Sequence, residues 1–261
     1  MKKYLVIGNP IEHSLSPKLH NHWIKENKID AIYEKKQLNE SDIQKVIAEV
    51  KNEKINGINV TVPFKKYVLQ FLDQLTPRAI MTQSVNTIFK EGDVLVGDNT
   101  DVGGFELSFK HINYNPKNKS VLILGAGGVA SSIVVVLKKF GVSKIFLTNR
   151  TKSKAEGIKK IHSDIEILDW GKFTNFDMII NATSLGLKKE DKIELDYSKV
   201  GKGKLFYDLI YNPTKTNFLL KGEELGNKIQ NGKMMFIYQA QLAFKIWHNI
   251  LPKVHDKLLE I

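Results

Sequence analysis

The sequence predicts an α/β protein with two domains, and three observations support this. Its 261 residues are more than one domain of ordinary size usually holds. After Gly104, short apolar runs alternate with stretches of helical periodicity, as strands and helices of a parallel sheet do. Before Gly104, apolar runs are separated by segments rich in short polar side chains. We therefore expect the character of the fold to change near residue 104.

The first part of the chain predicts two strands and two helices. Residues 3–7 are apolar and end in a Gly-Asn-Pro turn, which predicts a strand. Ser16 and Pro17 predict a helix start, with serine as N-cap and proline at N1. Residues 58–62 predict a second strand, and apolar residues recur at helical spacing over 67–75. These elements form an α/β domain.

The second part predicts a doubly wound sheet. Residues 120–124 are apolar throughout, as expected of a strand that is buried on both faces of a parallel sheet. Further strands are predicted at 144–147, 166–168, 178–180 and 204–210, with helices up to about 140 and at about 152–161. A last helix, at about 234–250, is expected to return to the first domain. The predicted domains are 1–104 plus 237–261, and 105–236.

A glycine-rich turn follows the strand at 120–124. The run Gly125-Ala126-Gly127-Gly128-Val129-Ala130 fits the pattern G-x-G-x-x-G/A between a strand and a helix. Glycine permits the tight turn and lets the backbone approach a pyrophosphate, which lies at the helix N-terminus. We therefore predict a Rossmann-type dinucleotide-binding domain whose site includes Gly125, Ala126, Gly127, Gly128 and Val129.

The end of the next strand separates NADP from NAD. An NAD enzyme usually places Asp or Glu there for the ribose 2′-hydroxyl. Residues 148–154 contain no carboxylate, and the guanidinium of Arg150 can bind a 2′-phosphate. We predict NADP as the cofactor, with Asn149, Arg150, Thr151 and Lys154 in its site. The alternative is that Asn149 caps a helix and Arg150 is a solvated surface residue.

Two later loops are predicted to face the same cofactor. Thr183 and Ser184 follow the strand at 178–180, and small hydroxyl residues would let the cofactor lie close to that edge of the sheet. Leu209, near the end of the strand at 204–210, is assigned to the same site.

Composition and charge exclude several classes of function. Without cysteine there is no disulfide, thiolate metal site or cysteine nucleophile, so an oxidoreductase must move hydride directly. The seven histidines show no metal-ligand spacing, so no metal is predicted. No apolar run approaches the roughly 20 residues that span a bilayer, and no secretory segment is recognised. We expect a cytoplasmic protein with no membrane partner.

The net charge of +11 raises the question of a nucleic-acid partner. Most of the excess lies between residues 105 and 236, which hold 22 basic and 13 acidic residues. This is the part predicted to bind a dinucleotide, which is a polyanion. The lysines there are scattered and form no block with interleaved aromatic residues. We therefore predict no nucleic-acid partner.

Short motifs along nearly the whole chain resemble those of the shikimate dehydrogenase family. In chain order they are residues 8–17, 57–65, 85–87, 99–104, 149–151, 181–184 and 211–213. The resemblance implies reversible, NADPH-dependent reduction of 3-dehydroshikimate to shikimate, a step in the shikimate pathway of aromatic amino acid biosynthesis. It also implies a substrate domain joined to a Rossmann domain.

The resemblance further implies a role for particular residues. It assigns Lys65 and Asp101 as the catalytic pair. Reduction of a ketone creates an alkoxide, and Lys65 can supply both a proton and a positive charge there. The two groups would titrate together, so the proton is not assigned to one of them. The substrate residues that the resemblance implies are Ser14 and Ser16 for the carboxylate, Asn59, Thr61, Asn86 and Gln239 for the ring hydroxyls, and Tyr211 near the carboxylate.

Some positions depart from the family pattern, and alternatives stay open. Gln83-Ser84 stands where the family usually has Gly-Ala, and Met234 where it tends to have a small residue. One alternative is a quinate/shikimate dehydrogenase with relaxed substrate or cofactor choice. Another is a non-catalytic sensor that binds NADP. Methylenetetrahydrofolate dehydrogenase would leave the Ser14/Ser16 motif unexplained, and glutamyl-tRNA reductase needs a cysteine. The oligomeric state is left open, with a homodimer as one candidate.

Overall fold

The computed structural model describes residues 1–172, 174–255 and 258. The chain divides into two compact units, Met1–Gly104 with Ile237–Ile261, and Phe105–Phe236. The unit boundaries fall inside two helices, α4 (Thr100–His111) and α8 (Lys233–His248). Within the described ranges, no helix has the length and apolar character needed to cross a membrane.

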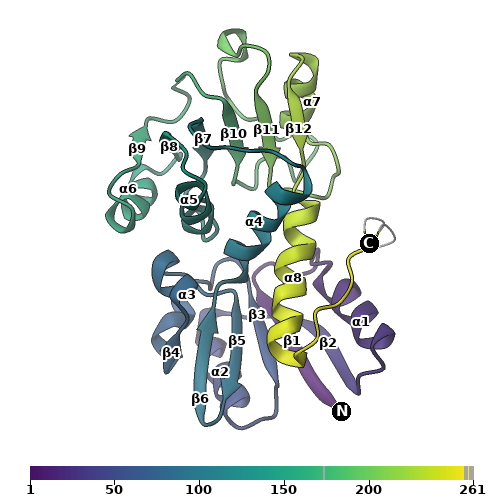
Figure 1. Cartoon of the computed structure of the whole chain (residues 1–261). Helices are drawn as coiled ribbons and strands as arrows, with labels where there is room; N and C mark the ends of the chain where they lie inside the picture. The colour runs from purple at the N-terminus through teal and green to yellow at the C-terminus, as the bar shows by residue number, and fades with distance from the viewer. Residues whose placement is uncertain (173, 256–257, 259–261) are drawn as a thin grey trace. The chain divides into compact units, whose positions relative to one another are not determined.

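The first unit contains a mixed six-stranded sheet in the order β2-β1-β3-β5-β6-β4 (Figure 1). β1 pairs in parallel with β2 and β3, whereas β5 is antiparallel to both β3 and β6. The strands are β1 (Lys2–Gly8), β2 (Ala31–Gln37), β3 (Gly57–Val60), β4 (Gln74–Leu75), β5 (Thr87–Glu91) and β6 (Val94–Asp98). The helices are α1 (Ser16–Glu26), α2 (Ile43–Lys51), α3 (Pro77–Thr82) and parts of α4 and α8, with 3₁₀ helices η1 (Glu40–Asp42) and η2 (Tyr67–Phe71).

Alternation along β1 distributes its side chains between two layers. Leu5 and Ile7 belong to the core cluster that includes α2. Tyr4, on the opposite face, packs against Trp247 of α8, with ring centroids 5.0 Å apart. Successive strand residues point to opposite faces, so β1 is buried on both sides. Helices therefore cover both faces of this sheet.

The second unit contains a six-stranded sheet in the order β12-β11-β10-β7-β8-β9, and every pairing in it is parallel. Its strands are β7 (Ser120–Leu124), β8 (Lys144–Thr148), β9 (Glu166–Leu168), β10 (Met178–Asn181), β11 (Leu205–Asp208) and β12 (Lys228–Gln230). Its helices are α5 (Ala130–Lys139), α6 (Lys152–Ile161), α7 (Asn217–Glu224) and the 3₁₀ helix η3 (Tyr197–Lys199). Numbered within the unit, this order is that of a doubly wound dinucleotide-binding sheet, with its switch point between β7 and β10. The predicted fold class is confirmed.

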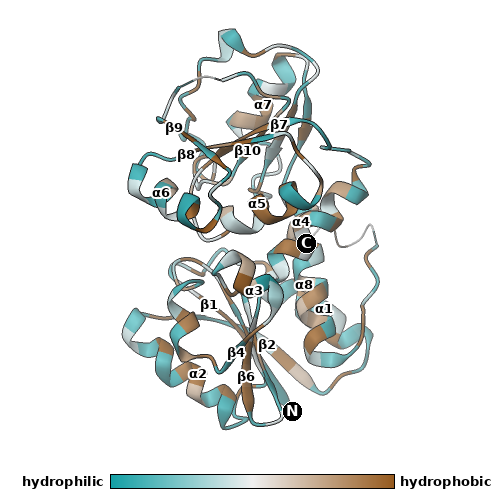
Figure 2. Cartoon of the chain, turned by 60° about the vertical axis from the view of Figure 1, so that its left-hand side comes forward, coloured by the Kyte–Doolittle hydropathy of each residue, from teal (hydrophilic) through white to brown (hydrophobic). Residues whose placement is uncertain are grey.

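Two helices of this unit differ in how much of their surface is buried, and their sequences explain the difference. Seven residues of α5 are buried, including Ile133, Val134 and Val136. In α6 only Ala155 and Ile158 are buried. Figure 2 shows the corresponding contrast between the hydrophobic α5 and the largely hydrophilic α6. The apolar face decides how far each helix enters the core.

Two local predictions in the first unit are wrong. Ser16 is the first residue of α1 and the N-cap is Leu15, so Ser16 is not the cap. The residues after 66 form only the 3₁₀ helix η2, because the chain then becomes extended at Leu72 and pairs with β6 as β4. Ladder hydrogen bonds to β6 replace the helical continuation that the apolar spacing predicted. Neither α2 nor the β5–β6 hairpin was predicted from the sequence.

Gln83 adopts the left-handed conformation that favours glycine. It is the C-cap of α3 with φ 48°, and its side-chain amide donates to the carbonyl of Ile80 at 2.8 Å. The turn at this departure from the family pattern is therefore formed with glutamine. A non-glycine residue in this conformation costs on the order of 1 kcal/mol.

Candidate active site

Lys65 and Asp101 form a shielded ion pair in the first unit. Lys65 lies beyond the end of β3, and Asp101 lies in the first turn of α4. The Nζ atom of Lys65 is 2.6 Å from Oδ2 of Asp101, and their side chains are 11% and 7% exposed. Opposite charges attract more strongly with little water between them. The structure thus brings together the two residues that the family resemblance implied as a catalytic pair.

Asn86 holds the other oxygen of the same carboxylate. Its Nδ2 donates to Oδ1 of Asp101 at 2.9 Å, and its Oδ1 accepts from the backbone N–H of Thr100 at 2.8 Å. The N–H of Asp101 in turn donates to Oδ1 of Asn99 at 3.1 Å. Each Asp101 oxygen therefore has its own partner, which fixes the orientation of the carboxylate toward Lys65.

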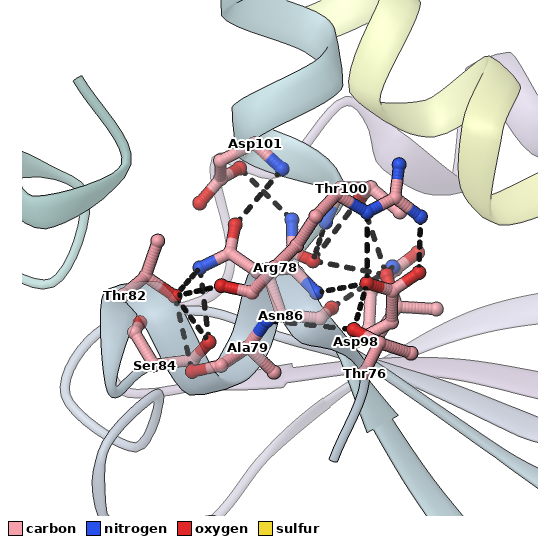
Figure 3. A network of polar contacts seen from close by, with 12 residues as sticks. Thr76, Arg78, Ala79, Thr82, Ser84, Asn86, Asp98, Thr100 and Asp101 are labelled. Atoms are coloured by element: carbon pink, nitrogen blue, oxygen red, sulfur yellow. Dashed lines mark hydrogen bonds and ion pairs between the residues drawn. The ribbon is translucent and has the colours of Figure 1, made fainter. Parts of the chain in front are cut away.

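A second ion pair, with a buried carboxylate, supports the turn that carries Asp101 (Figure 3). Asp98 ends β6, and its carboxylate pairs with the guanidinium of Arg78. Its Oδ1 also accepts from Oγ1 of Thr76 at 2.6 Å and from the N–H of Asn99 at 2.7 Å. A buried charge persists only when it is paired and hydrogen-bonded. This pair was not predicted from the sequence, although Asp98 adjoins the motif at 99–104.

Tyr33 connects two predicted substrate residues and was also missed. Its hydroxyl donates to Oδ1 of Asn59 at 2.6 Å, and it is hydrogen-bonded with the side chain of Ser16. Burial raises the pKa of Tyr33 well above its usual range, against the opposing effect of the Ser16 hydrogen bond. His20 stacks on Tyr33 at 4.2 Å, and burial lowers the pKa of His20 to about 3. Nothing in the sequence around Tyr33 marks it as part of a binding site, because it is simply an aromatic residue in β2.

The remaining predicted substrate residues of this unit are less enclosed. Ser14 is half-buried, and its Oγ accepts from the N–H of Ser16 at 3.3 Å. Thr61 directly follows β3 and packs closely against Gly8. A Cβ added at Gly8 would lie only 2.5 Å from the methyl carbon of Thr61. Gln239 is half-buried on α8. Ser14, Ser16, Asn59, Thr61, Asn86 and Gln239 all lie in the first unit, and Tyr211 lies in the second.

The glycine-rich turn of the second unit lies at the switch point of its sheet. Gly125 follows β7 with φ 103°, and a Cβ there would be 2.9 Å from the backbone of Ala182, which follows β10. Only glycine fits this turn. A Cβ at Gly127 would meet nothing within 4 Å, and the Val129 N-cap of α5 supplies no side-chain hydrogen bond. Backbone N–H groups at this helix start can therefore bind a pyrophosphate.

The residues after β8 fit a cofactor with a 2′-phosphate. Asn149 accepts from the N–H of Ala126 at 3.0 Å and donates to the carbonyl of Thr151 at 2.8 Å. The N-cap of α6 is Thr151, so the alternative in which Asn149 caps this helix is wrong. Arg150, Thr151 and Lys154 are exposed, and no ion pair involving Arg150 occurs among the described residues. The guanidinium is thus available to an anionic ligand.

A buried carboxylate, Asp208, joins the loops after β10 and β11. Its Oδ1 accepts from Nδ2 of Asn181 and from the N–H of Ile210, each at 3.0 Å. Its Oδ2 accepts from Oγ1 of Thr216 at 2.5 Å. Oδ1 of Asn181 accepts from both the N–H and the hydroxyl of Thr183. Burial raises the pKa of Asp208 to about 6, although the hydrogen bonds oppose that shift.

Leu209 and Ser184, the other predicted cofactor residues of these loops, lie next to this network. The N–H of Leu209 donates to the carbonyl of Asn181 at 3.0 Å, and Ser184 is exposed beside Thr183.

Tyr211 is the one predicted substrate residue of the second unit. Its ring stacks on Phe236, with the ring centroids 4.5 Å apart. Met234, the second departure from the family pattern, is buried in the unit at 4% exposure.

Comparisons with known proteins agree with these two regions. Residues 6–88 match the substrate-binding domain of shikimate dehydrogenase, and residues 106–209 match the family described as shikimate/quinate 5-dehydrogenase. The shikimate dehydrogenase (NADP(+)) of Pelagibacter ubique is 56% identical over 260 residues, which cover 100% of this chain and 98% of that protein.

Two solved structures share the fold over the whole chain. Shikimate dehydrogenase from Aquifex aeolicus is 36% identical with a TM-score of 0.91, covering 100% of this chain and 96% of that one. The Thermus thermophilus enzyme, solved in complex with NADP(H) and shikimate, is 29% identical with a TM-score of 0.89, covering 100% and 97%. At these identities and coverages, the chain belongs to the shikimate dehydrogenase family.

Proposed function

We propose that this chain is an NADP-dependent oxidoreductase that reversibly reduces 3-dehydroshikimate to shikimate, in the shikimate pathway of aromatic amino acid biosynthesis. The unit 1–104 plus 237–261 binds the substrate, and the unit 105–236 binds NADP. The observation that carries the proposal is the shielded 2.6 Å pair of Lys65 and Asp101, in a chain 56% identical to a relative named for this activity.

Lys65 and Asp101 perform the proton transfer. When bound, NADPH supplies hydride to the carbonyl carbon of the substrate. The carbonyl oxygen gains negative charge and takes a proton from the Lys65–Asp101 pair, which gives the alcohol. In the opposite direction the pair would take the hydroxyl proton of the alcohol. Asp101, held by Asn86, keeps the Lys65 ammonium in position.

Polar side chains of the first unit recognise a small polyhydroxylated acid. Ser14 and Ser16 bind its carboxylate, with Tyr211 contributing near it. Asn59, Thr61, Asn86 and Gln239 bind the ring hydroxyls. Tyr33 acts as a positioning residue, because one hydroxyl contacts both Asn59 and Ser16. Sites that hydrogen-bond substrate hydroxyls reject analogues that leave those groups unpaired.

NADP binds along the switch point of the second sheet. The backbone of the glycine-rich turn would hold the pyrophosphate, and Arg150 with its neighbours would hold the 2′-phosphate. Support comes from the open space at Gly127 and the exposure of Arg150. The residues assigned to the site are Gly125, Ala126, Gly127, Gly128, Val129, Asn149, Arg150, Thr151, Lys154, Thr183, Ser184 and Leu209.

The test is to follow NAD(P)H absorbance with shikimate or quinate as substrate and NADP⁺ or NAD⁺ as acceptor. Signal mainly with shikimate and NADP⁺ is expected. Comparable rates with quinate or NAD⁺ would favour the relaxed alternative, which the shikimate/quinate family description keeps open. Silence in all four assays with NADPH still bound would favour the sensor. A homodimer, a cytoplasmic location and the lack of a nucleic-acid partner stay predictions from the sequence.

A further inference from the structure

Three potential metal ligands meet in the first unit, apart from the residues assigned above. They are His22, Glu26 and His255, whose ligand atoms all lie within 4.8 Å of one another. His22 and Glu26 are four residues apart on α1, so they share one face of that helix. His255 comes from the carboxyl-terminal tail, the segment that follows α8 from Asn249 onward. The three residues form no metal-ligand spacing in the sequence, because His255 is remote from the other two along the chain.

The separation of two of these atoms suits a tetrahedral ion. Nε2 of His255 lies 3.5 Å from Oε1 of Glu26. Two ligands bound tetrahedrally to zinc at about 2.0–2.1 Å are roughly 3.3–3.4 Å apart. The imidazole rings of His22 and His255 are 5.7 Å apart and inclined at 74°. Only small side-chain rotations are then needed to bring all three atoms onto one ion.

The surrounding structure places the third ligand and favours a cation. The tail is held before His255 by Nε2 of Gln241, which donates to the carbonyl of Pro252 at 2.7 Å, and after it by the fully buried Leu258. Glu26 is the last residue of α1, where the helix dipole attracts positive charge. A ligand set that is mostly assembled loses little ordering free energy on binding.

We propose that His22, Glu26 and His255 bind one divalent transition-metal ion, best matched by Zn²⁺, which fastens the carboxyl-terminal tail to α1. Two imidazoles and one carboxylate are a donor set of zinc, whereas Ca²⁺ and Mg²⁺ prefer oxygen ligands. Water completes the coordination, because His22 and Glu26 are exposed. The site is structural and does not depend on the proposed function.

The first measurement is calorimetric titration of Zn²⁺ into the full chain after chelator treatment. One saturable equivalent is expected. His22→Ala, Glu26→Gln and His255→Ala should each weaken binding by at least about tenfold, since loss of even an outer partner of a ligand typically costs that much. The matched control is His111→Ala, an exposed histidine in the second unit, which should bind as the wild type does. Absence of a saturable equivalent, or unchanged affinity in His255→Ala, overturns the site.

The second measurement tests the tail directly. Lys253 is exposed and two residues before His255, so trypsin cleavage after it reports on the tail. Zn²⁺ should slow this cleavage in the wild type and in His111→Ala, and leave it unchanged in His22→Ala. Far-UV circular dichroism and unfolding without metal establish that each variant is folded. Equal protection by Zn²⁺ in His22→Ala would show that the ion does not join the tail to α1, and the proposal would fail.

Discussion

The two proposed binding regions differ in how far the protein itself satisfies their polar groups. In the first unit, Lys65, Asp101, Asn86 and Asn59 are bonded to one another or to the backbone and are largely buried. In the second unit, the side chains proposed for the 2′-phosphate are exposed. A reacting centre needs groups held in place before the substrate arrives. A polyanion can be held by backbone N–H groups and by cations that order on binding.

The largest expected effect is at Lys65. Lys65→Ala should lower kcat for shikimate oxidation by about 10²–10⁴-fold, because a proton-transfer group is lost. Lys66→Ala, the exposed neighbour, is the matched control and should retain the wild-type kcat. Steady-state kinetics with NADP⁺ measures both. A loss of less than tenfold in Lys65→Ala would remove it from the mechanism.

The Arg78–Asp98 pair beneath Asp101 should matter for stability. Arg78→Ala leaves Asp98 buried without its guanidinium, and we expect a loss of about 2–3 kcal/mol of unfolding free energy. This is below the loss for a fully enclosed pair because Arg78 is 35% exposed. The control is Lys152→Ala, which breaks the solvent-exposed pair with Asp169 and should change stability by less than about 0.5 kcal/mol. Urea unfolding measures both, and equal losses would contradict the contrast between shielded and exposed pairs.

A substitution of Arg150 tests the exposed binding region of the second unit. Arg150→Ala should raise KM for NADPH by about ten- to a hundredfold, the equivalent of a charge-assisted contact, with kcat little changed. KM for NADH should stay as it is, since NADH lacks the 2′-phosphate. Lys172→Ala, an exposed lysine of the same unit outside the proposed site, serves as the control. An unchanged KM for NADPH would mean that Arg150 is only a solvated surface residue.

The last expected effect is a pH dependence at Asp208, the enclosed carboxylate of the second unit. Its pKa is about 6, against 3.8 for a solvated aspartate. The folded state therefore binds the proton more tightly, and this group's contribution to stability is fully present below about 3.8 and lost as pH rises through about 6.

Asp208→Asn should remove that slope, which amounts to about 1–3 kcal/mol between about pH 4 and 6.5. Urea unfolding of both chains across this interval gives the difference. Asp177→Asn is a control for which the pH dependence of stability has the opposite sign. A backbone hydrogen bond from Ser120 lowers the pKa of Asp177, so the contribution of this group to stability is lost as pH falls. Parallel pH profiles for the wild type and Asp208→Asn would show that Asp208 is not the titrating group.

Local sequence signals predicted most of the strands and helices of the second unit. The alternation in residues 120–210 and the turn at Gly125 agree with the parallel sheet, because buried parallel strands and left-handed turns each require particular residues. Lys65 and Asp101 were named through the family resemblance, and they do meet. Tyr33, Asp98 and Asp208 were missed, since a polar or aromatic residue in a strand carries no local mark of its partner.

Two local predictions failed, one because of a remote strand pairing and one because of a contact two residues away. The apolar spacing over 67–75 suits a helix, but pairing of β4 with β6 ends it at Phe71. Ser16 has the composition of an N-cap, yet the helix begins at Ser16 itself and the hydroxyl of Ser14 accepts its N–H. In both places, the hydrogen bonds that form in the folded chain decide the local structure, because local preferences are small enough for such bonds to override.

The sequence by itself determined the α/β class, the glycine turn with its positive φ, and the residues available for chemistry, because these depend on side-chain size, hydrophobic period and backbone freedom within a few neighbours. Only the tertiary structure decided which polar groups pair. Tyr33 with Asn59, Arg78 with Asp98, and His255 with Glu26 each join different elements. Such pairs depend on the order of strands and the placement of the tail, which arise from packing of the whole unit and leave no pattern in any short stretch of sequence.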